Sequence, residues 1–222
     1  MITRRIFVTG GTGYLGRPLI ERLVARNHRI TALVRQASAD KIPVGATMVI
    51  GNALAPRTFA SAISPADTLV HLVGVRHPNP FKSHAFRTID LKSIQASVVA
   101  ACQAGIEHFV YLSVAQPAPV MQVYQQVRQE GEALIAEAGL NATFLRPWYV
   151  LGPGHHWPYL LMPIYSLLEK IPATQEGAKR LGLVHHSQML DALVHAVEHP
   201  VRGTCILDVP AIRALSSLEP AT

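Results

Sequence analysis

The chain has 222 residues, of which 49% are hydrophobic and 15% charged; this excludes general disorder and is enough apolar material for one large domain. Lys and Arg number 20 and Asp and Glu 14, so the net charge is +6. Because the basic residues are spread along the chain, we expect no nucleic-acid-binding tail, and anionic small molecules stay open as ligands.

Strand-length apolar runs alternate with longer helical patterns. In chain order we expect a strand at 6–9, a helix at 14–26, strands at 29–34, 47–50 and 68–73, a helix at 88–104, a strand at 108–113, a helix at 122–138, a strand at 142–145, a helix at 187–198 and a strand at 204–209. Apolar strands that alternate with helices are typical of a parallel sheet covered on both faces. The sequence therefore predicts a doubly wound α/β fold with a parallel sheet of about seven strands.

Two stretches interrupt the alternation. Residues 74–86 hold two prolines and two histidines and are expected to form a long loop, and residues 147–184 are rich in proline and apolar side chains. The second stretch follows the expected strand at 142–145, at the edge where parallel sheets build ligand sites. We expect a single domain over 1–222, with a small substrate lobe from about 150–185 and the C-terminal end.

The strongest motif is a glycine-rich turn between the first strand and the first helix. Three glycines match G-x-G-x-x-G, and a second set matches G-x-x-G-x-x-G. Glycines there allow a sharp turn, close approach of a pyrophosphate and tight helix packing, and the helix N-terminus offers free N–H groups. The motif predicts a dinucleotide site; the alternative is a tight turn without a ligand. The predicted cofactor contacts are Gly10, Gly11, Thr12, Gly13, Tyr14, Leu15 and Gly16.

The residue at the end of the second strand indicates which dinucleotide is preferred. An Asp or Glu there would bond the ribose 2′-hydroxyl of NAD, but this chain has Arg35. A guanidinium suits the 2′-phosphate of NADP, and Arg17 could add a second positive charge. We therefore predict that NADP is preferred over NAD; the alternative is that both arginines are solvated surface charges.

The glycine turn, Leu33-Val34-Arg35, Tyr124-x-x-x-Arg128 and Leu145-Arg146-Pro147 together resemble the short-chain dehydrogenase/reductase superfamily, which has a Rossmann-type fold. The chain is most similar to its atypical NAD(P)-binding members: the NmrA-like and isoflavone-reductase-like proteins and the dehydrogenase-like accessory subunit of respiratory complex I. The resemblance covers residues 4 to about 210.

Active members of this superfamily use a Ser, a Tyr and a Lys four residues after the Tyr. The resemblance implies Tyr124 as proton donor, with Arg128 in the place of the lysine. Arg keeps the positive charge but has a different geometry and cannot act as a neutral relay. Ser113 is the candidate serine, although the family spacing also allows Val114, which has no hydroxyl. The catalytic candidates are thus Tyr124, Arg128 and Ser113.

The resemblance implies further cofactor contacts beyond the glycine turn. They follow the third strand, the fourth strand and the sixth strand, where adenine, the adenosine ribose and the nicotinamide would lie. These residues are Asn52, Ala53, Leu72, Val73, Gly74 and Pro147.

The remaining features suggest no metal. The adjacent pairs His155-His156 and His185-His186 would point to opposite faces of a strand, and no carboxylate or cysteine cluster accompanies them. The apolar run at 157–168 is interpreted as a helix capping the core, as the lid of an apolar pocket, or as a partner or membrane-surface contact. The sequence is compatible with a homodimer or with a partner protein.

Two functions are compatible with these features. The first is an NADP(H)-dependent oxidoreductase or isomerase acting on a small, fairly apolar carbonyl compound. The second is a non-catalytic dinucleotide-binding protein, either a redox sensor or an accessory or assembly factor of a larger complex. We expect a cytoplasmic location, because two unpatterned cysteines suit a reducing compartment, and neither a signal peptide nor a transmembrane segment is recognisable.

Overall fold

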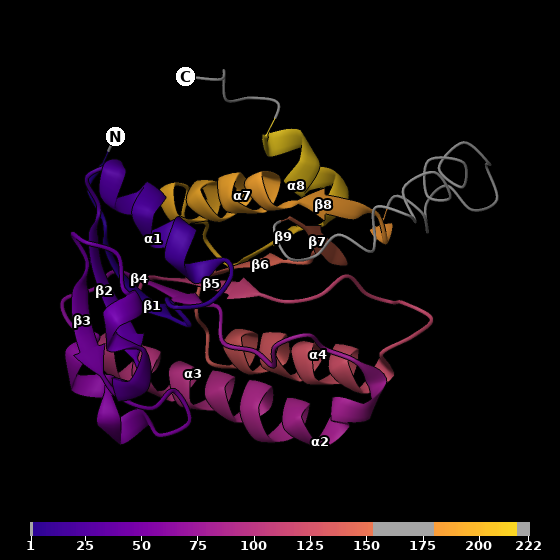
Figure 1. Ribbon diagram of the computed structural model, residues 1–222, viewed down its shortest axis with the longest axis horizontal. Coiled ribbons are helices and arrows are strands. Elements are labelled where there is room, and N and C mark those ends of the chain that lie inside the picture. Colours follow the sequence, from indigo (N-terminus) through magenta and orange to yellow (C-terminus); the bar gives the residue numbers. More distant parts are fainter. Residues whose placement is uncertain (1, 153–179, 217–222) are drawn as a thin grey trace.

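The computed structural model describes residues 2–152 and 180–216. Within them, a seven-stranded parallel sheet has the order β3-β2-β1-β4-β5-β6-β9. This confirms the doubly wound α/β fold predicted from the sequence (Figure 1). The strands are β1 (Arg5–Thr9), β2 (Arg29–Val34), β3 (Thr47–Ile50), β4 (Thr68–His71), β5 (His108–Leu112), β6 (Ala142–Leu145) and β9 (Thr204–Leu207).

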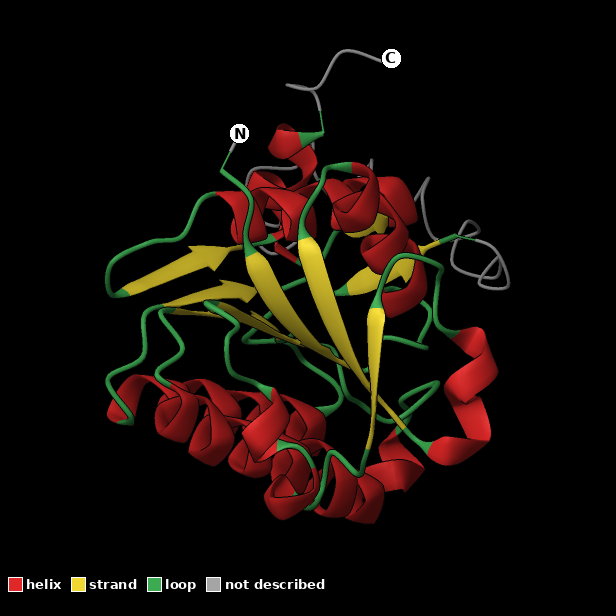
Figure 2. Cartoon of the chain, turned by 90° about the vertical axis from the view of Figure 1, so that its left-hand side faces the viewer, coloured by secondary structure: helices red, strands yellow, loops and turns green. Residues whose placement is uncertain are grey.

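Helices cover both faces of the sheet, as the apolar strands require. One layer holds α1, α7 and α8 and the other α2, α3 and α4, and Figure 2 shows the sheet between the two layers. Within β1, Ile6 and Val8 face the α1–α7 core while Phe7 faces the α3–α4 core. The helices are α1 (Gly16–Ala25), α2 (Ser83–Ala85), α3 (Lys92–Ala104), α4 (Gln122–Glu137), α7 (His186–Glu198) and α8 (Val209–Leu215).

The order of the strands reverses at β1, and the region beyond the carboxyl ends of β1 and β4 is called the crevice below. From β1 the chain passes outward to β2 and β3, and then returns to β4 on the other side of β1. Thr9, the last residue of β1, is the register partner of His71, the last residue of β4. In open parallel sheets such a reversal leaves space for a ligand beyond the carboxyl ends of the strands. The glycine turn follows Thr9 directly and therefore lies at this crevice.

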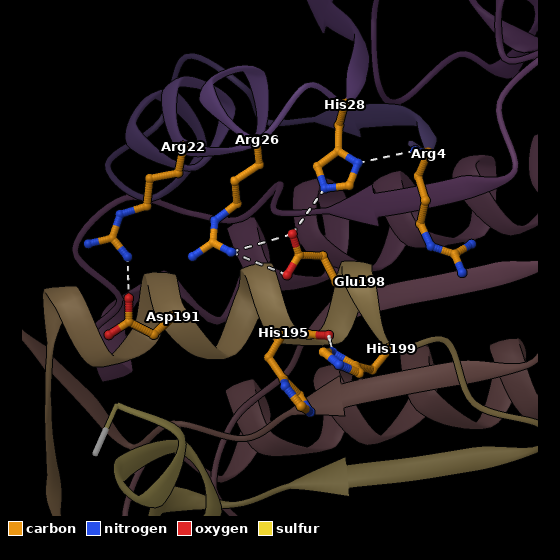
Figure 3. A network of polar contacts seen from close by, with 8 residues as sticks. All are labelled: Arg4, Arg22, Arg26, His28, Asp191, His195, Glu198 and His199. Carbon is orange, nitrogen blue, oxygen red and sulfur yellow. Dashed lines mark hydrogen bonds and ion pairs between the residues drawn. The ribbon is translucent and has the colours of Figure 1, made fainter. Parts of the chain in front are cut away.

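Two helices that are far apart in the sequence are joined by ion pairs (Figure 3). Arg22 of α1 pairs with Asp191 of α7, and Arg26 lies 3.4 Å from the carboxylate of Glu198. Glu198 also lies 3.2 Å from Nε2 of His28, whose Nδ1 accepts the backbone N–H of Arg4 at 3.1 Å. These contacts attach α7 to the glycine-turn helix, α1.

Some elements differ from the expected ones. The helix expected from residue 88 is α3, which begins at Lys92, because residues 86–91 form a π-helical segment, η5 (Phe86–Leu91). The structure adds α8, which Asp208 caps by accepting the N–H of Ala211. It also adds a two-stranded parallel sheet of β7 (Tyr149–Leu151) and β8 (Leu183–His185). The expected loop at 74–86 contains η4 (Pro80–Lys82) and α2.

Part of the predicted substrate lobe lies outside the described residues. This holds for His155, His156 and the apolar run at 157–168. In the part of the chain that the structure describes, no helix combines the length and the apolar character needed to span a membrane.

Candidate functional site

The glycine turn is folded tightly against the end of β4. Gly10 has a φ of +79°, and a Cβ atom there would lie 2.8 Å from the backbone carbon of Leu72. Its carbonyl oxygen accepts the N–H of Gly13 at 3.0 Å, and a Cβ atom on Gly16 would overlap that same oxygen. Gly10 is thus required for its positive φ angle and Gly16 for the close packing of α1 on the turn.

The outer side of this turn is open to a ligand. Gly13 is exposed, and a Cβ atom on it would meet only the carbonyl oxygen of Gly10, at 3.1 Å. Leu15 at the N-cap of α1 offers no side-chain hydrogen bond. Arg17 donates its N–H to the carbonyl oxygen of Gly13 at 3.2 Å and Pro18 has no N–H, so the N–H groups of Leu15 and Gly16 and the positive end of the helix dipole are what this turn offers a pyrophosphate.

Tyr14 and His186 connect the turn to the second half of the chain. Their rings pack edge to face with centroids 4.5 Å apart, and Nε2 of His186 donates to the carbonyl oxygen of Tyr14 at 3.1 Å. His186 opens α7. No local pattern in the sequence marks this contact, since the two residues are 172 positions apart.

Arg35 and Asn52 follow neighbouring strands at the same edge of the sheet. Arg35 is exposed directly after β2, and the structure records no ion pair for it with a described residue. Asn52 follows β3, which pairs with β2 through Val34 and Ile50. The side-chain oxygen of Asn52 accepts the N–H of Leu54 at 3.0 Å. The side-chain NH₂ group is therefore the part of Asn52 that can donate a hydrogen bond to a ligand.

Arg17 and Ala53 complete this side of the crevice. Arg17 lies in the first turn of α1, exposed, with Nε 3.2 Å from Oε1 of Glu21 one turn later. Such an exposed pair holds the guanidinium only weakly, so it stays available to an anion. Ala53 is half-buried beside Asn52.

The loop after β4 is held on both sides. Leu72 donates its N–H to the carbonyl oxygen of Thr9 at 3.0 Å, and Val75 donates its N–H to Oδ2 of Asp90 at 3.0 Å. Between them, Val73 and Gly74 are half-buried, and a Cβ atom on Gly74 would lie 2.5 Å from Nη2 of Arg128. The loop thus passes directly over Arg128.

Tyr124 and Arg128 lie one turn apart at the start of α4. The half-buried Tyr124 ring packs on Phe86, with centroids 4.9 Å apart, and Cζ of Arg128 lies 5.1 Å from its centroid. Arg128 is buried and donates through Nη2 to Asp90 Oδ1 at 2.6 Å and through Nη1 to the carbonyl oxygen of Leu112 at 2.9 Å. Both terminal nitrogens of Arg128 therefore already bind protein atoms.

The pKa values of Arg128 and of its partner Asp90 are both shifted from their ordinary values. Burial lowers the pKa of Arg128, but attraction to Tyr124, Tyr111 and Asp90 outweighs it, so the net pKa is raised and the guanidinium stays charged. Burial raises the pKa of Asp90, while the charge of Arg128 and the N–H of Val75 act in the opposite direction. Burial likewise raises the pKa of Tyr111 to about 12.

Ser113 is part of a second buried cluster. Its hydroxyl donates to Oε1 of Glu132 at 2.5 Å, and Glu132 also accepts from Nε of Arg146 at 2.9 Å and Nη2 at 2.5 Å. Gln116 adds a hydrogen bond to the same carboxylate at 3.2 Å. The hydroxyl of Ser113 is thus committed to Glu132. Val114, the other position allowed by the family spacing, is buried.

A third buried group lies beneath the glycine turn. Nδ1 of His71 lies 2.9 Å from Oγ1 of Thr9 and 3.0 Å from Oγ of Ser97, and Nε2 lies 3.3 Å from Oγ of Ser93. Burial, with a smaller contribution from Arg128, lowers the pKa of His71 to about 3. His71 is therefore a neutral hydrogen-bonding group at physiological pH.

The structure thus brings the predicted residues to one edge of the sheet. Pro147 follows β6 and accepts the N–H of Ala115 through its carbonyl oxygen at 3.0 Å, which places it beside the loop after β5. Asp90 and His71 were missed, because nothing local in the sequence marks a lone Asp or His as a buried partner. Among residues 2–152 and 180–216, no group of three His, Cys, Asp or Glu residues is placed to hold a metal ion.

Comparison with known proteins agrees with this geometry. Residues 10–155 match the model of an NAD(P)H-binding family. A 3-diazoavenalumate denitrifying reductase from a Streptomyces species is 30% identical over 90% of this chain and 74% of its own length. A ceramide reductase of Caulobacter vibrioides is 24% identical over 89% and 62%. The photosystem II assembly factor Ycf39 of Synechocystis is 29% identical over 64% and 44%.

Solved structures show the same fold. The Bordetella bronchiseptica enzyme WbmH in complex with NAD+ superimposes with a TM-score of 0.69 at 19% identity, covering 93% of this chain and 75% of that one. The chain spans only 44–62% of the length of three of the curated relatives that it matches. Family model, relatives and fold agree: the chain belongs to the NAD(P)H-binding family, among the atypical short-chain dehydrogenase/reductase proteins.

Proposed function

We propose that the chain is an NADP(H)-dependent reductase or isomerase that acts on a small, fairly apolar carbonyl compound. The observation that supports this most is the placement of Tyr124 beside Arg128, with its ring held by Phe86 at the edge of the sheet that carries the glycine turn. The structure records no hydrogen bond from the Tyr124 hydroxyl to a described residue, so this phenol is available to a substrate oxygen.

The cofactor would be held by the turn and the two strand ends beside it. The N–H groups at the start of α1 would bind the pyrophosphate, and Arg35 and Arg17 the 2′-phosphate of NADP. The NH₂ group of Asn52 would bond the adenine edge, and the backbone of Leu72, Val73 and Gly74 would line the adenosine ribose. NADPH held in this way would supply the hydride, and Pro147 would line the nicotinamide side of the site.

In this proposal Tyr124 donates the proton that the substrate oxygen needs when the carbonyl carbon accepts the hydride. In the place of the family's lysine, Arg128 would also orient the nicotinamide ribose. Its terminal nitrogens already bind Asp90 and Leu112, so its supported contribution is to hold Tyr124 and the loop at Gly74 in place. The lobe around residues 150–185 would supply the walls of the substrate pocket.

A non-catalytic dinucleotide-binding protein is the second candidate. The observation in its favour is that Ser113 and Arg128, two of the three catalytic positions, are bound to Glu132 and Asp90. A chain that bound the cofactor as a sensor or as an assembly factor would need no free serine.

Single-turnover oxidation of NADPH distinguishes the two candidates. The absorbance of NADPH bound to the wild-type protein is followed with a panel of aldehydes, ketones and quinones. The proposal expects oxidation with at least one compound, a loss of about a hundredfold to ten-thousandfold in Tyr124→Phe, and little change in NADPH affinity. Equal rates in wild type and Tyr124→Phe would contradict the proposal, and a flat trace throughout would favour the second candidate.

A further inference from the structure

Asp90 is a buried carboxylate that the proposed reaction does not use. Its side chain is 0% exposed and that of Arg128 3%, and their closest atoms are 2.6 Å apart. The second oxygen of Asp90 accepts the N–H of Val75, so one carboxylate joins η5, α4 and the loop after β4. Burying two charges is costly, and here each charge has further hydrogen bonds that offset the cost.

The pair lies against the proposed proton donor. Cζ of Arg128 is 5.1 Å from the ring centroid of Tyr124 and 5.7 Å from that of Tyr111. A guanidinium alone at this distance would favour the tyrosinate form, since opposite charges within about 4–6 Å stabilise each other. The carboxylate of Asp90, 2.6 Å from Nη2 of the same guanidinium, acts in the opposite direction.

Among residues 2–152 and 180–216, the other titratable groups recorded around the pair are neutral or paired with each other at the surface. Tyr111 of β5 is buried and stays neutral, and so does His71 of β4. Arg87 of η5 and Glu130 of α4 are exposed and pair with each other at 3.5 Å. The local charge at Tyr124 is therefore set by Arg128 and Asp90.

We propose that Asp90 is a positioning residue of the reductase site: it fixes Arg128 beside Tyr124 and cancels the Arg128 charge, so that Asp90 controls how readily the Tyr124 phenol ionises. This role of Asp90 rests on the proposed reductase function, but the ionisation of the Tyr124 phenol can be measured without substrate. The replacement of the family's Lys by Arg128 is explained in the same way, because the forked guanidinium reaches Asp90 and Leu112 simultaneously.

The experiment is a charge cycle read by tyrosinate absorbance. Wild type, Asp90→Asn, Arg128→Gln and the double variant are titrated from neutral to alkaline pH, each beside its Tyr124→Phe counterpart, and the difference isolates Tyr124 among the six tyrosines. Asp90→Asn leaves a net positive charge, so the Tyr124 transition should move to lower pH by about one unit. Arg128→Gln should move it to higher pH, and the double variant should return it close to the wild-type position.

Asp67→Asn is the matched control, because Asp67 pairs with Arg4 and Arg5 at the opposite ends of the strands and should leave the transition unchanged. Folding of every variant is checked by near-UV circular dichroism. An unchanged transition in folded Asp90→Asn would overturn the proposal. If Asp90→Asn does not fold, the other two variants decide. The proposal is then overturned if Arg128→Gln does not move the Tyr124 transition to higher pH, or if the double variant does not return it to the wild-type position. Failure of the reductase function would show separately, as absent NADPH oxidation in wild type.

Discussion

The two sides of the crevice treat their polar groups differently. Around β1 and β2, the exposed backbone at Gly13 and the exposed side chain of Arg35 have no ion pair or side-chain hydrogen bond with a described residue. Around β5 and α4, Ser113 and Arg128 are bound to Glu132 and Asp90. We expect the first side to bind an anion. On the second side, buried hydrogen bonds fix Ser113 and Arg128, and Arg128 lies beside the ring of Tyr124.

This difference shows that side chains at two of the family's catalytic positions, Ser113 and Arg128, are hydrogen-bonded to other protein groups. Ser113 and Arg128 occupy the region of the catalytic residues, but their polar atoms stabilise the fold. Substitutions on the second side should therefore lower stability more than ligand affinity, and substitutions on the first side should do the reverse.

The largest expected effect is on stability, at Glu132. Glu132→Ala removes a carboxylate that binds Ser113, Gln116 and Arg146 and leaves their donors unpaired. We expect the free energy of unfolding to fall by about 2–4 kcal/mol, since water still reaches part of Arg146. Urea unfolding measures this. Glu130→Ala on the same helix, where the carboxylate is exposed, is the control and should cost less than about 1 kcal/mol. If Glu132→Ala lowered NADPH affinity more than it lowered the free energy of unfolding, the proposed difference between the two sides would be contradicted.

The glycine turn should show the opposite pattern at Gly13. Gly13→Val adds an exposed side chain whose Cβ lies 3.1 Å from the carbonyl oxygen of Gly10, a tight contact that a small shift of the turn must relieve. The side chain fills the space needed by the pyrophosphate, so NADPH affinity should fall by about a hundredfold or more, or about 2.7 kcal/mol. Gly13→Ala should lose less. Calorimetry measures affinity, and the midpoint of thermal unfolding should change little in either variant. Normal NADPH binding by Gly13→Val would mean that the turn holds no cofactor.

Two buried histidines predict how stability depends on pH. Burial lowers the folded-state pKa of His71 to about 3 and, with a smaller effect of Arg4, that of His108 to about 4. The unfolded chain takes up these protons below about pH 6.5 and the folded chain does not, so the free energy of unfolding falls as pH falls from about 6.5 toward 4. Each histidine contributes about 1.4 kcal/mol per pH unit. In His108→Phe the measured slope should be smaller by that amount, and an identical slope would contradict the assignment.

The last of these effects concerns cofactor choice. Arg35→Asp removes the cation expected at the 2′-phosphate and should weaken NADPH binding by about tenfold to a hundredfold while sparing or improving NADH binding. Fluorescence titration with both dinucleotides measures this. Arg57→Asp, another exposed arginine, is the control. Equal losses for NADPH and NADH in Arg35→Asp would make Arg35 a general surface charge.

Much of the first side could be predicted from the sequence because its signals are local. The strands at 29–34, 47–50 and 142–145 match β2, β3 and β6 in both bounds, and the glycine turn carries its spacing within seven residues. The start of α3 was wrong, because the turn over Phe86–Leu91 has π-helical hydrogen bonds although its apolar pattern is continuous with α3. The pairing of β7 with β8 joins residues more than thirty positions apart, which no local pattern predicts.

The second side depended on contacts that only the fold creates. Asp90 and Arg128 are 38 positions apart, and Ser113 and Glu132 are 19 apart. Whether such residues serve a substrate or each other is decided by burial and distance, and these follow from the packing of α4 against η5 and β5. The sequence therefore predicted where Ser113 and Arg128 lie but not what they bind.

Calorimetric titration of the wild-type protein with NADPH and with NADH tests the central claim most directly, that the glycine turn and Arg35 form an NADP(H) site. We expect saturable binding of one NADPH per chain, about tenfold to a hundredfold tighter than NADH. Absence of heat with both dinucleotides, in protein shown to be folded, would contradict it.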